Sequence, residues 1–472
     1  MENPDATLIA ISPTESEARR DAWAWPVPLM IATFLLLALI SLAPDPVVGK
    51  MSPIQTAINN NAVTGAAMRF LGLADARFGH LLALLALVVL ASVGIYVWCI
   101  KQVRTERITL RRLLTVAGIC CALLVLTPPL LSRDLFAVGF YGKISVFYHE
   151  NPYLVTPQKF VGDPWLAFMS TNWKNTPMVY GPVVWLISSA GALIFGRSIA
   201  ANLVFLKVCM AGAHIANAVL IWHILDRIAP ERRELGTLLY AWNPVVIMIG
   251  VGGGHNDIIM MAFVLLAFLL LLKERPMLGF ASLTLAVLVK YVSLIFMAMY
   301  LFHLLSQYGG WKQRLKQLSR YGAVFLGICT VFFLPLWGGL STFKAMIRSA
   351  GKINVLSSRW VLATFLKAIF RHIFLLSEAT AASLASALAA VAMGVLFVYI
   401  FFHILRRYQA REELGEAWAL AIFAFLATAG YVLPWYLIWF MPLLPLMPWD
   451  RRSQAMLGVS MVAMYLALDL WP

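Results

Sequence analysis

The feature that most constrains the fold of this chain is a series of long apolar stretches that recur from one end of the sequence to the other. Most are long enough to cross a bilayer as a helix, and the clearest are Val27–Ala43, Leu81–Ile100, Leu113–Leu131, Ala200–Leu225, Ile258–Leu272, Val324–Trp337 and Ala381–Leu405. In lipid every backbone polar group needs a partner within the protein, and a helix provides one. Strands of a membrane barrel would alternate apolar and polar residues, which these stretches do not. We therefore predict an all-α, polytopic integral membrane protein.

Positive charge lies mainly in short clusters between the apolar stretches. The net charge is +15, but no basic globular domain offers a face to a nucleic acid, so we exclude nucleic-acid binding. Basic connections tend to stay in the cytoplasm, where we place Arg19-Arg20, Lys101–Arg112, Arg227–Arg233, Lys273–Arg275, Lys312–Arg320, Arg406–Arg411 and Arg451-Arg452. This predicts about 13 spans with the N-terminus inside and the C-terminus outside. They are residues 27–43, 79–100, 113–131, 199–224, 236–251, 256–272, 277–289, 291–305, 321–338, 380–405, 415–432, 434–447 and 454–471.

The sequence shows no internal repeat and no soluble domain. We therefore expect a cytoplasmic N-terminal tail at residues 1–26 and a single transmembrane domain at residues 27–472. Its outer loops, at residues 132–179, 252–257 and 339–378, are expected to hold interfacial helices. The apolar segment Tyr180–Gly196 would reverse the later topology if it spanned the membrane, so we predict that it is re-entrant or lies at the outer surface. The five cysteines lie in or beside apolar helices and are interpreted as small core residues.

Few carboxylates lie on the predicted outer side, and Asp134 is the best placed. It ends the sequence Leu131-Ser132-Arg133-Asp134, where a long apolar helix meets the outer surface. A carboxylate there lies level with the lipid headgroups and can act as a general base towards a lipid-linked substrate. The alternative is an interfacial helix cap paired with Arg133. Residues Leu135–Glu150, which mix aromatic and charged side chains, are predicted to form a helix in the membrane interface.

A glycine-rich run, Gly252-Gly253-Gly254-His255-Asn256-Asp257, joins two apolar helices at the same predicted face. Glycine allows the backbone to approach a ligand closely. The run is not a dinucleotide-binding fingerprint, because no strand precedes it and the spacing differs. The side chains of His255, Asn256 and Asp257 can orient hydroxyl groups of a ligand or hold a metal ion. The alternative is a polar helix cap.

Lys290 interrupts the apolar run from Met277 to Tyr300. A lysine within the hydrocarbon layer is costly and is usually functional. If two short helices meet at Lys290, its ammonium group emerges at the outer face, where it can bind a lipid phosphate. The cytoplasmic placement of Lys312–Arg320 requires such a turn. We therefore favour phosphate binding over the alternative, a lysine that snorkels to the headgroups.

Two later outer segments are basic or aromatic. In the loop at residues 339–378, Lys344, Arg348 and Lys352 are spaced so that a helix would place them on one face. Positive charge on the outer side opposes the usual preference of Lys and Arg for cytoplasmic connections. Either the predicted topology is wrong there or these side chains contact anionic lipid phosphates. Tyr431–Trp439 is typical of an interfacial aromatic belt, and stacking against a ligand ring is the alternative.

Several short motifs follow one another in a fixed order. After Asp134 they are Asn151-Pro152-Tyr153, Tyr180-Gly181-Pro182, Asn243-Pro244, His255-Asn256-Asp257, Lys290-Tyr291 and Pro434-Trp435-Tyr436. Their order and spacing resemble the GT-C superfamily of membrane glycosyltransferases, and more closely the bacterial polyprenyl-phosphate-mannose-dependent α-(1→6)-mannopyranosyltransferases. The resemblance covers most of the chain, and Asp134 follows a membrane helix as the catalytic aspartate of that family does. It departs from the usual pattern in having two more helices before the first acidic loop.

The resemblance implies an inverting transfer of a hexose, mannose by analogy, from a polyprenyl-phosphate donor to a hydroxyl group of a glycan or glycolipid. The site would face the extracytoplasmic side of the plasma membrane. Asp134 would deprotonate the acceptor, and Lys290, with Arg133 or Arg359 as helpers, would bind the donor phosphate. The residues implied to position donor or acceptor are His255, Asn256, Asp257, Asn151, Tyr153, Tyr180 and Trp435. Many relatives need no metal, so we assign no cofactor.

A multi-pass transporter or lipid flippase is the main alternative. It too would have many helices, buried cations such as Lys207 and Lys290, and broken helices near the midplane. Such proteins usually carry internal repeats, and their polar residues spread through the membrane depth. Here repeats are absent and the distinctive polar residues gather at one face. A non-catalytic assembly protein, the third possibility, would not need an outward carboxylate beside a cation.

Overall fold

The computed structural model describes residues 22–43, 66, 69–70, 78–350, 353–355 and 357–468. Over these residues the chain is helical, with no β-strand and a single isolated bridge between Gly338 and Leu340. The predicted all-α class is confirmed for this part of the chain. Most of the predicted tail at residues 1–26 lies outside the described residues, as does Lys352 of the predicted basic loop.

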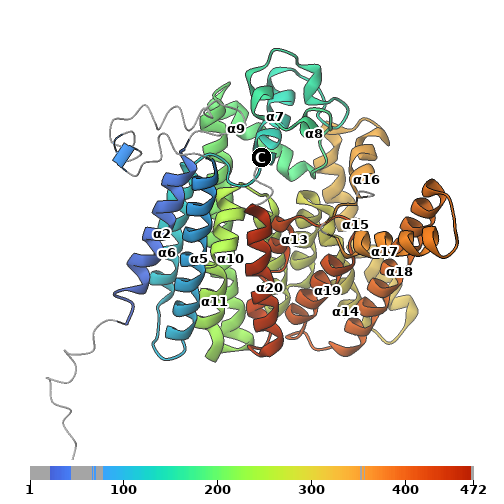
Figure 1. Ribbon diagram of the computed structural model, residues 1–472. Coiled ribbons are helices and arrows are strands. Elements are labelled where there is room, and N and C mark those ends of the chain that lie inside the picture. The colour runs from blue at the N-terminus through green and yellow to red at the C-terminus, as the bar shows by residue number, and fades with distance from the viewer. Residues whose placement is uncertain are drawn as a thin grey trace, which may run out of the picture.

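Figure 1 shows how the helices of the described residues are arranged. They are α2 (Pro26–Ser41), α5 (Phe78–Gln102), α6 (Leu110–Val125), α7 (Asp134–Phe147), α8 (Thr171–Lys174), α9 (Pro182–Phe195), α10 (Ile199–Ile228), α11 (Arg233–Ala241), a π-helical segment (Val246–Gly252), α12 (Asp257–Leu272), α13 (Pro276–Val289), α14 (Leu294–Ser306), α15 (Trp311–Phe333), α16 (Lys344–Ala350), α17 (Ser358–His372), α18 (Glu378–Arg407), α19 (Leu414–Thr428) and α20 (Arg451–Leu468). The helix predicted over Leu135–Glu150 is therefore present as α7, and its place in the membrane interface stays a prediction.

Among the described residues, four helices are long and apolar enough to cross a membrane in one piece. They are His80–Gln102, Ile199–Ile228, Trp311–Leu336 and Glu378–Arg407. A fifth span would be Pro230–Ala241 with Val246–Gly252, which are bent by 51° at their junction. Most of the other predicted spans correspond to apolar helices of 10–17 residues, so the membrane character is confirmed but the count of 13 is not. Some apolar runs yield short helices because a polar or proline residue interrupts them, as Lys290 does after α13.

The segment predicted to be re-entrant or superficial forms α9, which packs against α7, α10 and α13. Small residues allow the closest of these contacts. A Cβ atom on Gly142 of α7 would lie 2.3 Å from the backbone oxygen of Ser188 in α9, so only glycine permits this separation. As a result α7, α8 and α9 lie together at the upper end of the bundle (Figure 1).

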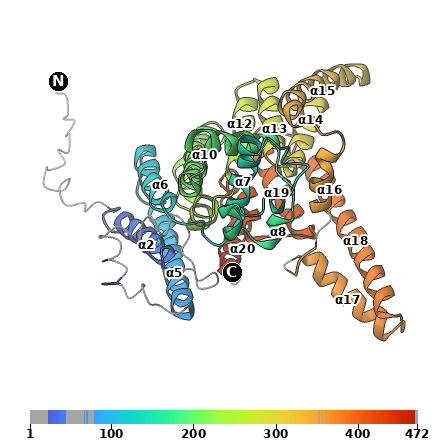
Figure 2. The ribbon, with the colours of Figure 1, turned by 90° about the horizontal axis from the view of Figure 1, so that it is seen from above.

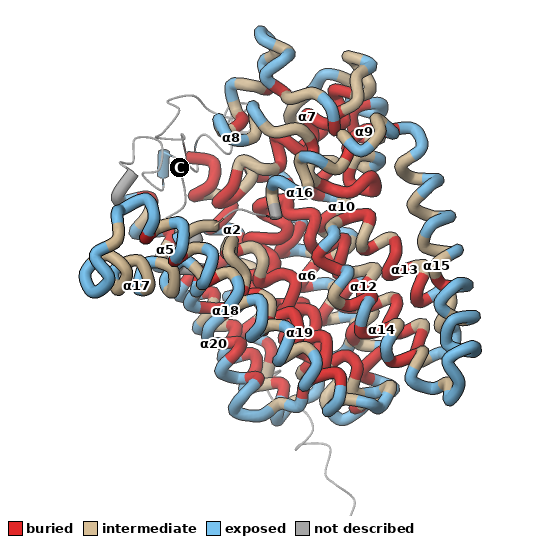
Figure 3. The backbone as a smooth tube through the Cα atoms, turned by 90° about the vertical axis from the view of Figure 1, so that its right-hand side faces the viewer, coloured by how far each residue is buried: buried red, intermediate tan, exposed pale blue. Residues whose placement is uncertain are grey.

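The outer helices expose apolar side chains in a way that suits contact with lipid. Buried residues are concentrated in the interior of the bundle, whereas α15 is largely exposed (Figure 3). The side chains of Val331 in α15 and Val391 in α18 are 69% and 62% exposed. Helices α17 and α18 pack against each other and project from the bundle (Figure 2). An apolar surface of this extent indicates a membrane environment rather than water.

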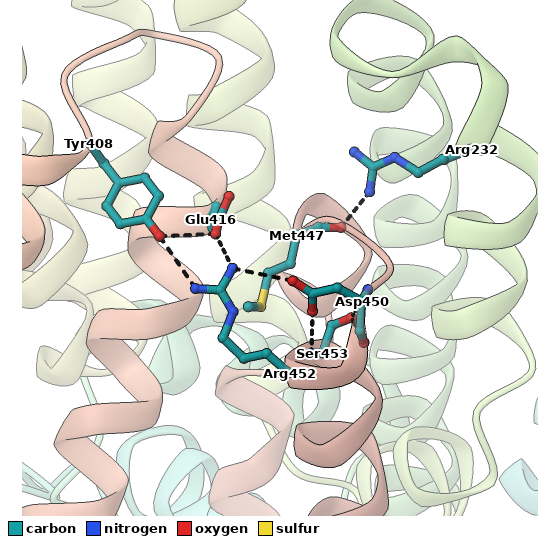
Figure 4. A network of polar contacts seen from close by, with 7 residues as sticks. All are labelled: Arg232, Tyr408, Glu416, Met447, Asp450, Arg452 and Ser453. Carbon is teal, nitrogen blue, oxygen red and sulfur yellow. Dashed lines mark hydrogen bonds and ion pairs between the residues drawn. The ribbon is translucent and has the colours of Figure 1, made fainter.

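Three of the basic connections predicted to share one side of the membrane are joined by contacts at the lower end of the bundle. The guanidinium group of Arg452 forms an ion pair with Glu416 at 2.5 Å, and the Tyr408 hydroxyl donates to the same carboxylate at 3.0 Å (Figure 4). Nearby, Arg232 donates to the backbone oxygen of Met447 (Figure 4). These contacts join the α10–α11 connection, the α18–α19 connection and the start of α20, at the end of the bundle opposite α7.

Candidate active site

A cavity of about 430 Å³ lies at the end of the bundle that carries α7 and α8. This volume is within the range of roughly 300–1,000 Å³ that is usual for small-molecule sites. Segments far apart in the sequence line it, and their residues are Leu131, Ser132, Arg133, Asp134, Ser170, Asn172, Trp173, Thr176, Val179, Tyr180, Lys290, Tyr291, Ser349, Tyr431, Leu433, Trp435 and Tyr436. The lining thus includes five of the predicted site residues: Arg133, Asp134, Tyr180, Lys290 and Trp435.

Asp134 is the first residue of α7 and lies at the wall of this cavity. The turn before it is tight, because Leu131 has a positive φ of 59°, which is uncommon for a residue with a side chain. The Ser132 hydroxyl accepts a hydrogen bond of 3.1 Å from the Asp134 backbone N–H. The indole N–H of Trp173 donates to Asp134 Oδ1 at 2.6 Å, which fixes the carboxylate and leaves Oδ2 for another partner.

Lys290 lies where α13 ends, with an extended backbone at φ −154° and ψ 125°. The break predicted from the sequence is therefore present, and the side chain reaches the cavity. Its Nζ is 2.6 Å from Oδ1 of Asp257, whose side chain is only 1% exposed. The rings of Tyr436 and Trp439 flank the ammonium group at 4.9 and 5.0 Å from their centroids. Lys290 is thus half of a nearly buried ion pair, with its own side chain 14% exposed.

His255 and Asn256 lie behind the wall of the cavity rather than on it. The imidazole of His255 stacks on Trp435, with ring centroids 4.7 Å apart and an interplanar angle of 17°. Burial lowers the pKa of His255, although the carboxylates of Asp134 and Asp257 act in the opposite direction. Within the described residues, His255 Nε2, Asn256 Nδ2 and Asp257 Oδ2 are buried without a hydrogen-bond partner.

The glycines before His255 allow close packing between helices. Gly254 has a φ of +74°, and a Cβ atom there would lie 2.5 Å from the side chain of Leu135. The run therefore brings the His255–Asp257 turn against the beginning of α7. This explains why a run distant in sequence from Asp134 lies close to it.

Comparison with known proteins identifies the family of this chain. Residues 31–306 match the model of the family described as "Alpha-(1->6)-mannopyranosyltransferase, N-terminal domain". The chain belongs to this family. It is a membrane mannosyltransferase of the GT-C type, as the order of the motifs indicated, and the transporter interpretation is set aside.

Individual mannosyltransferases of the family are similar over much of the chain. Alpha-(1->6)-mannopyranosyltransferase A of Mycobacterium tuberculosis is 25% identical over 399 residues, which cover 81% of this chain and 75% of the relative. The Corynebacterium glutamicum enzyme of the same name is 30% identical over 171 residues, or 35% of this chain and 34% of that protein. Alpha-(1->6)-mannopyranosyltransferase B of the same organism is 25% identical over 382 residues, or 75% of this chain and 62% of that protein.

Two predicted positioning residues, Asn151 and Tyr153, do not line the cavity of this mannosyltransferase but support its wall. The Asn151 side chain accepts from the Tyr153 backbone N–H at 3.0 Å and donates to the Leu336 oxygen at 2.6 Å. The Tyr153 hydroxyl donates to the backbone oxygen of Tyr180 at 2.7 Å. They therefore act on the cavity through Tyr180.

Tyr180 is held on its other side by the end of α13. The backbone N–H of Gly181 donates to the Val289 oxygen at 3.0 Å. A Cβ atom on Gly181 would lie 2.0 Å from the Leu288 oxygen, so this approach requires glycine. The contact places Tyr180 next to Lys290.

Arg359, predicted as a helper for phosphate binding, does not line the cavity. It lies in the first turn of α17, and its Nε is buried without a hydrogen-bond partner among the described residues. The loop before α17 is tied to the segment after α19, since the Asn354 side chain donates to the Val432 oxygen at 2.6 Å. The loop that precedes Arg359 is therefore attached to the segment that supplies Tyr431 and Leu433 to the cavity.

Sequence reasoning missed the contribution of the α8 region, which supplies Ser170, Asn172, Trp173 and Thr176 to the cavity. No motif marks these residues. The only signal was that the long outer loop before Tyr180 is rich in Pro, Asn, Trp and Tyr. As to metals, no group of three His, Cys, Asp or Glu side chains in the described part of the chain lies together as ligands.

Proposed function

We propose that this protein transfers a mannosyl group, with inversion, from a polyprenyl-phosphate donor to a hydroxyl group of a glycan or glycolipid acceptor. The observation that carries the proposal is that Asp134 and Lys290 line one cavity. A carboxylate that can accept a proton and an ammonium group that can meet a phosphate are the two charges that such a transfer needs. Family membership supports the choice of mannose, since the relatives are named as α-(1→6)-mannopyranosyltransferases.

In the proposed reaction the acceptor hydroxyl lies against Asp134 Oδ2. As the acceptor oxygen attacks the anomeric carbon, its proton passes to Asp134 and the bond from that carbon to the phosphate oxygen breaks. The electron pair of the broken bond leaves with the polyprenyl phosphate, where negative charge develops. Lys290 stabilises that charge, and Arg133, which lines the same cavity, is the second cation within reach. Because attack and departure occur on opposite faces of the carbon, the configuration inverts.

The other predicted residues act around this pair. Trp435 offers a ring to a bound sugar, and Tyr180 shapes the wall beside Lys290. The buried polar atoms of His255, Asn256 and Asp257 that have no partner among the described residues are suited to contact with sugar hydroxyl groups. Arg359 remains a proposed helper only if its segment moves towards the cavity.

We infer that the reaction takes place at the extracytoplasmic face of the plasma membrane. Three basic connections, between α10 and α11, between α18 and α19 and at the start of α20, lie at the end of the bundle opposite α7, and such connections favour the cytoplasm. The cavity would then open among the outer lipid headgroups, where a lipid-linked donor presents its phosphate. Residues 27–472 would form one transmembrane domain, preceded by a short cytoplasmic tail.

The test is turnover by the purified protein with synthetic polyprenyl-phosphate mannose and an α-mannoside acceptor, followed as release of polyprenyl phosphate. Replacement Asp134→Asn is expected to lower kcat by about 10²–10⁴-fold, because the base is lost. The matched control is Glu150→Gln, which removes an exposed carboxylate paired with Lys159 on the same outer connection. That variant is expected to retain wild-type turnover, since exposed ion pairs contribute little. Unchanged turnover in Asp134→Asn would rule out the proposed base.

A further inference from the structure

We propose that Trp173 and Asn172, in the α8 region at residues 170–176, form the acceptor subsite and recognise a sugar ring. This inference rests on the proposed function. Neither the order of motifs nor any predicted site residue points to this segment. It supplies four lining residues of the cavity, all from one side of it.

The position of the base fixes where the acceptor must bind. A general base works only when the proton to be removed is within about 2.6–3.2 Å. Asp134 Oδ1 already accepts the indole N–H of Trp173 at 2.6 Å. The acceptor hydroxyl that uses Oδ2 of the same carboxylate is therefore directly beside the Trp173 ring.

The position of the cation excludes the opposite arrangement. In an inverting transfer the leaving phosphate and the attacking oxygen lie on opposite faces of the anomeric carbon. The phosphate belongs beside Lys290, so the donor sugar occupies the space between Lys290 and Asp134. The acceptor then lies beyond Asp134, which is the side that α8 covers.

The side chains on this side suit a carbohydrate. A sugar ring has apolar C–H faces, which stack on aromatic rings, and polar edges, which form hydrogen bonds. Trp173 is half-buried and is held by stacking on Tyr180, at 5.8 Å between ring centroids and an interplanar angle of 24°. Asn172 is exposed at the mouth of the cavity, and its side-chain amide makes no hydrogen bond to the described part of the protein. The amide can therefore donate to and accept from ligand hydroxyl groups.

The segment is anchored firmly enough to select a ligand. The hydroxyl of Tyr141 in α7 donates to the Thr176 backbone oxygen at 2.7 Å. Further along α7, Lys143 forms a nearly buried ion pair with Asp163, just before the segment. These two contacts attach the segment to α7, the helix that begins with Asp134. They therefore hold the segment in a fixed position relative to the Asp134 carboxylate. Such preorganisation lowers the entropy cost of binding.

The experiment compares donor and acceptor kinetics in the full-length protein, with a synthetic α-(1→6)-linked mannose disaccharide as acceptor. Asn172→Ala is expected to raise the acceptor KM about three- to tenfold, the effect of losing one hydrogen bond, and to leave the donor KM unchanged. Trp173→Phe keeps an aromatic ring but removes the N–H that holds Asp134. It is expected to lower kcat, whereas Trp173→Ala should raise the acceptor KM as well.

The matched control is Asn175→Ala, three residues further along the same segment. Asn175 is exposed, but its amide donates to the Thr171 backbone oxygen at 3.1 Å and it does not line the cavity. This variant is expected to keep both KM values. A change in donor KM with an unchanged acceptor KM in Asn172→Ala would assign the segment to the donor and overturn the inference. Equal changes in Asn172→Ala and Asn175→Ala would also overturn it, whereas no turnover by the wild-type protein would overturn the proposed function itself.

Discussion

Replacement of Lys290 by methionine offers the sharpest test of the ion pair at the cavity. The carboxylate of Asp257 is 1% exposed and has Lys290 at 2.6 Å and the indole N–H of Trp439 as its partners. Without the lysine, a nearly buried negative charge keeps only one hydrogen bond. Removing one member of such a pair costs about 3–5 kcal/mol, and we expect the lower end because Lys290 is itself 14% exposed. The thermal midpoint should fall by on the order of 5 °C.

The double variant Lys290→Met, Asp257→Asn separates this structural cost from the role in catalysis. An amide at position 257 can still accept from Trp439 and carries no charge, so most of the lost stability should return. Turnover should not return, because the cation for the leaving phosphate is still missing. By analogy with other transition-state charge contacts, we expect kcat to remain about 10²–10³-fold below wild type.

The measurements are thermal unfolding of the purified protein in detergent and release of polyprenyl phosphate, made on the wild type, both single variants and the double variant. Asp257→Asn serves as the control, since it keeps the ammonium group and should retain more turnover than Lys290→Met. Recovery of both stability and turnover in the double variant would refute the phosphate-binding role of Lys290. An unchanged midpoint in Lys290→Met would refute the energetic argument.

Two further predictions concern the outer connection and the topology. Burial raises the pKa of Asp163, but hydrogen bonds from Lys143 and Tyr148 outweigh it, so the folded pKa lies below the ordinary value of 3.8. The Asp163 carboxylate therefore adds to the free energy of unfolding above about pH 4. This contribution is lost as the pH falls through the lowered pKa that Asp163 has in the folded protein. Asp163→Asn should flatten the decline of the thermal midpoint below pH 4, and a decline as steep as in wild type would contradict this. For topology, Val161→Cys, at a side chain that is 81% exposed, should react with an impermeant maleimide on intact cells, and Lys273→Cys only after permeabilisation. The reverse pattern would place the cavity in the cytoplasm.

The sequence could predict two residues that line the cavity because their chemistry conflicts with their surroundings. Asp134 at the end of an apolar run and Lys290 within one are costly in lipid, and that cost made them candidates for a functional role. The same reasoning could not pair Lys290 with Asp257, because nothing in a sequence shows which charges neutralise each other across a bundle. Trp173 could not be predicted at all, since one tryptophan in an aromatic loop has no distinguishing local pattern.

What the sequence determined by itself is the helical, membrane-embedded fold and the family. The apolar stretches determine the helical fold, because a backbone in lipid must form its hydrogen bonds between residues close in sequence. Such local pairing can be predicted along the chain. The order of the motifs determined the family. Only the tertiary structure decided the number of long helices and which residues form the cavity. Those outcomes depend on contacts between distant segments, such as Gly181 against Leu288 and Gly254 against Leu135, and close packing of this kind cannot be deduced from local pattern.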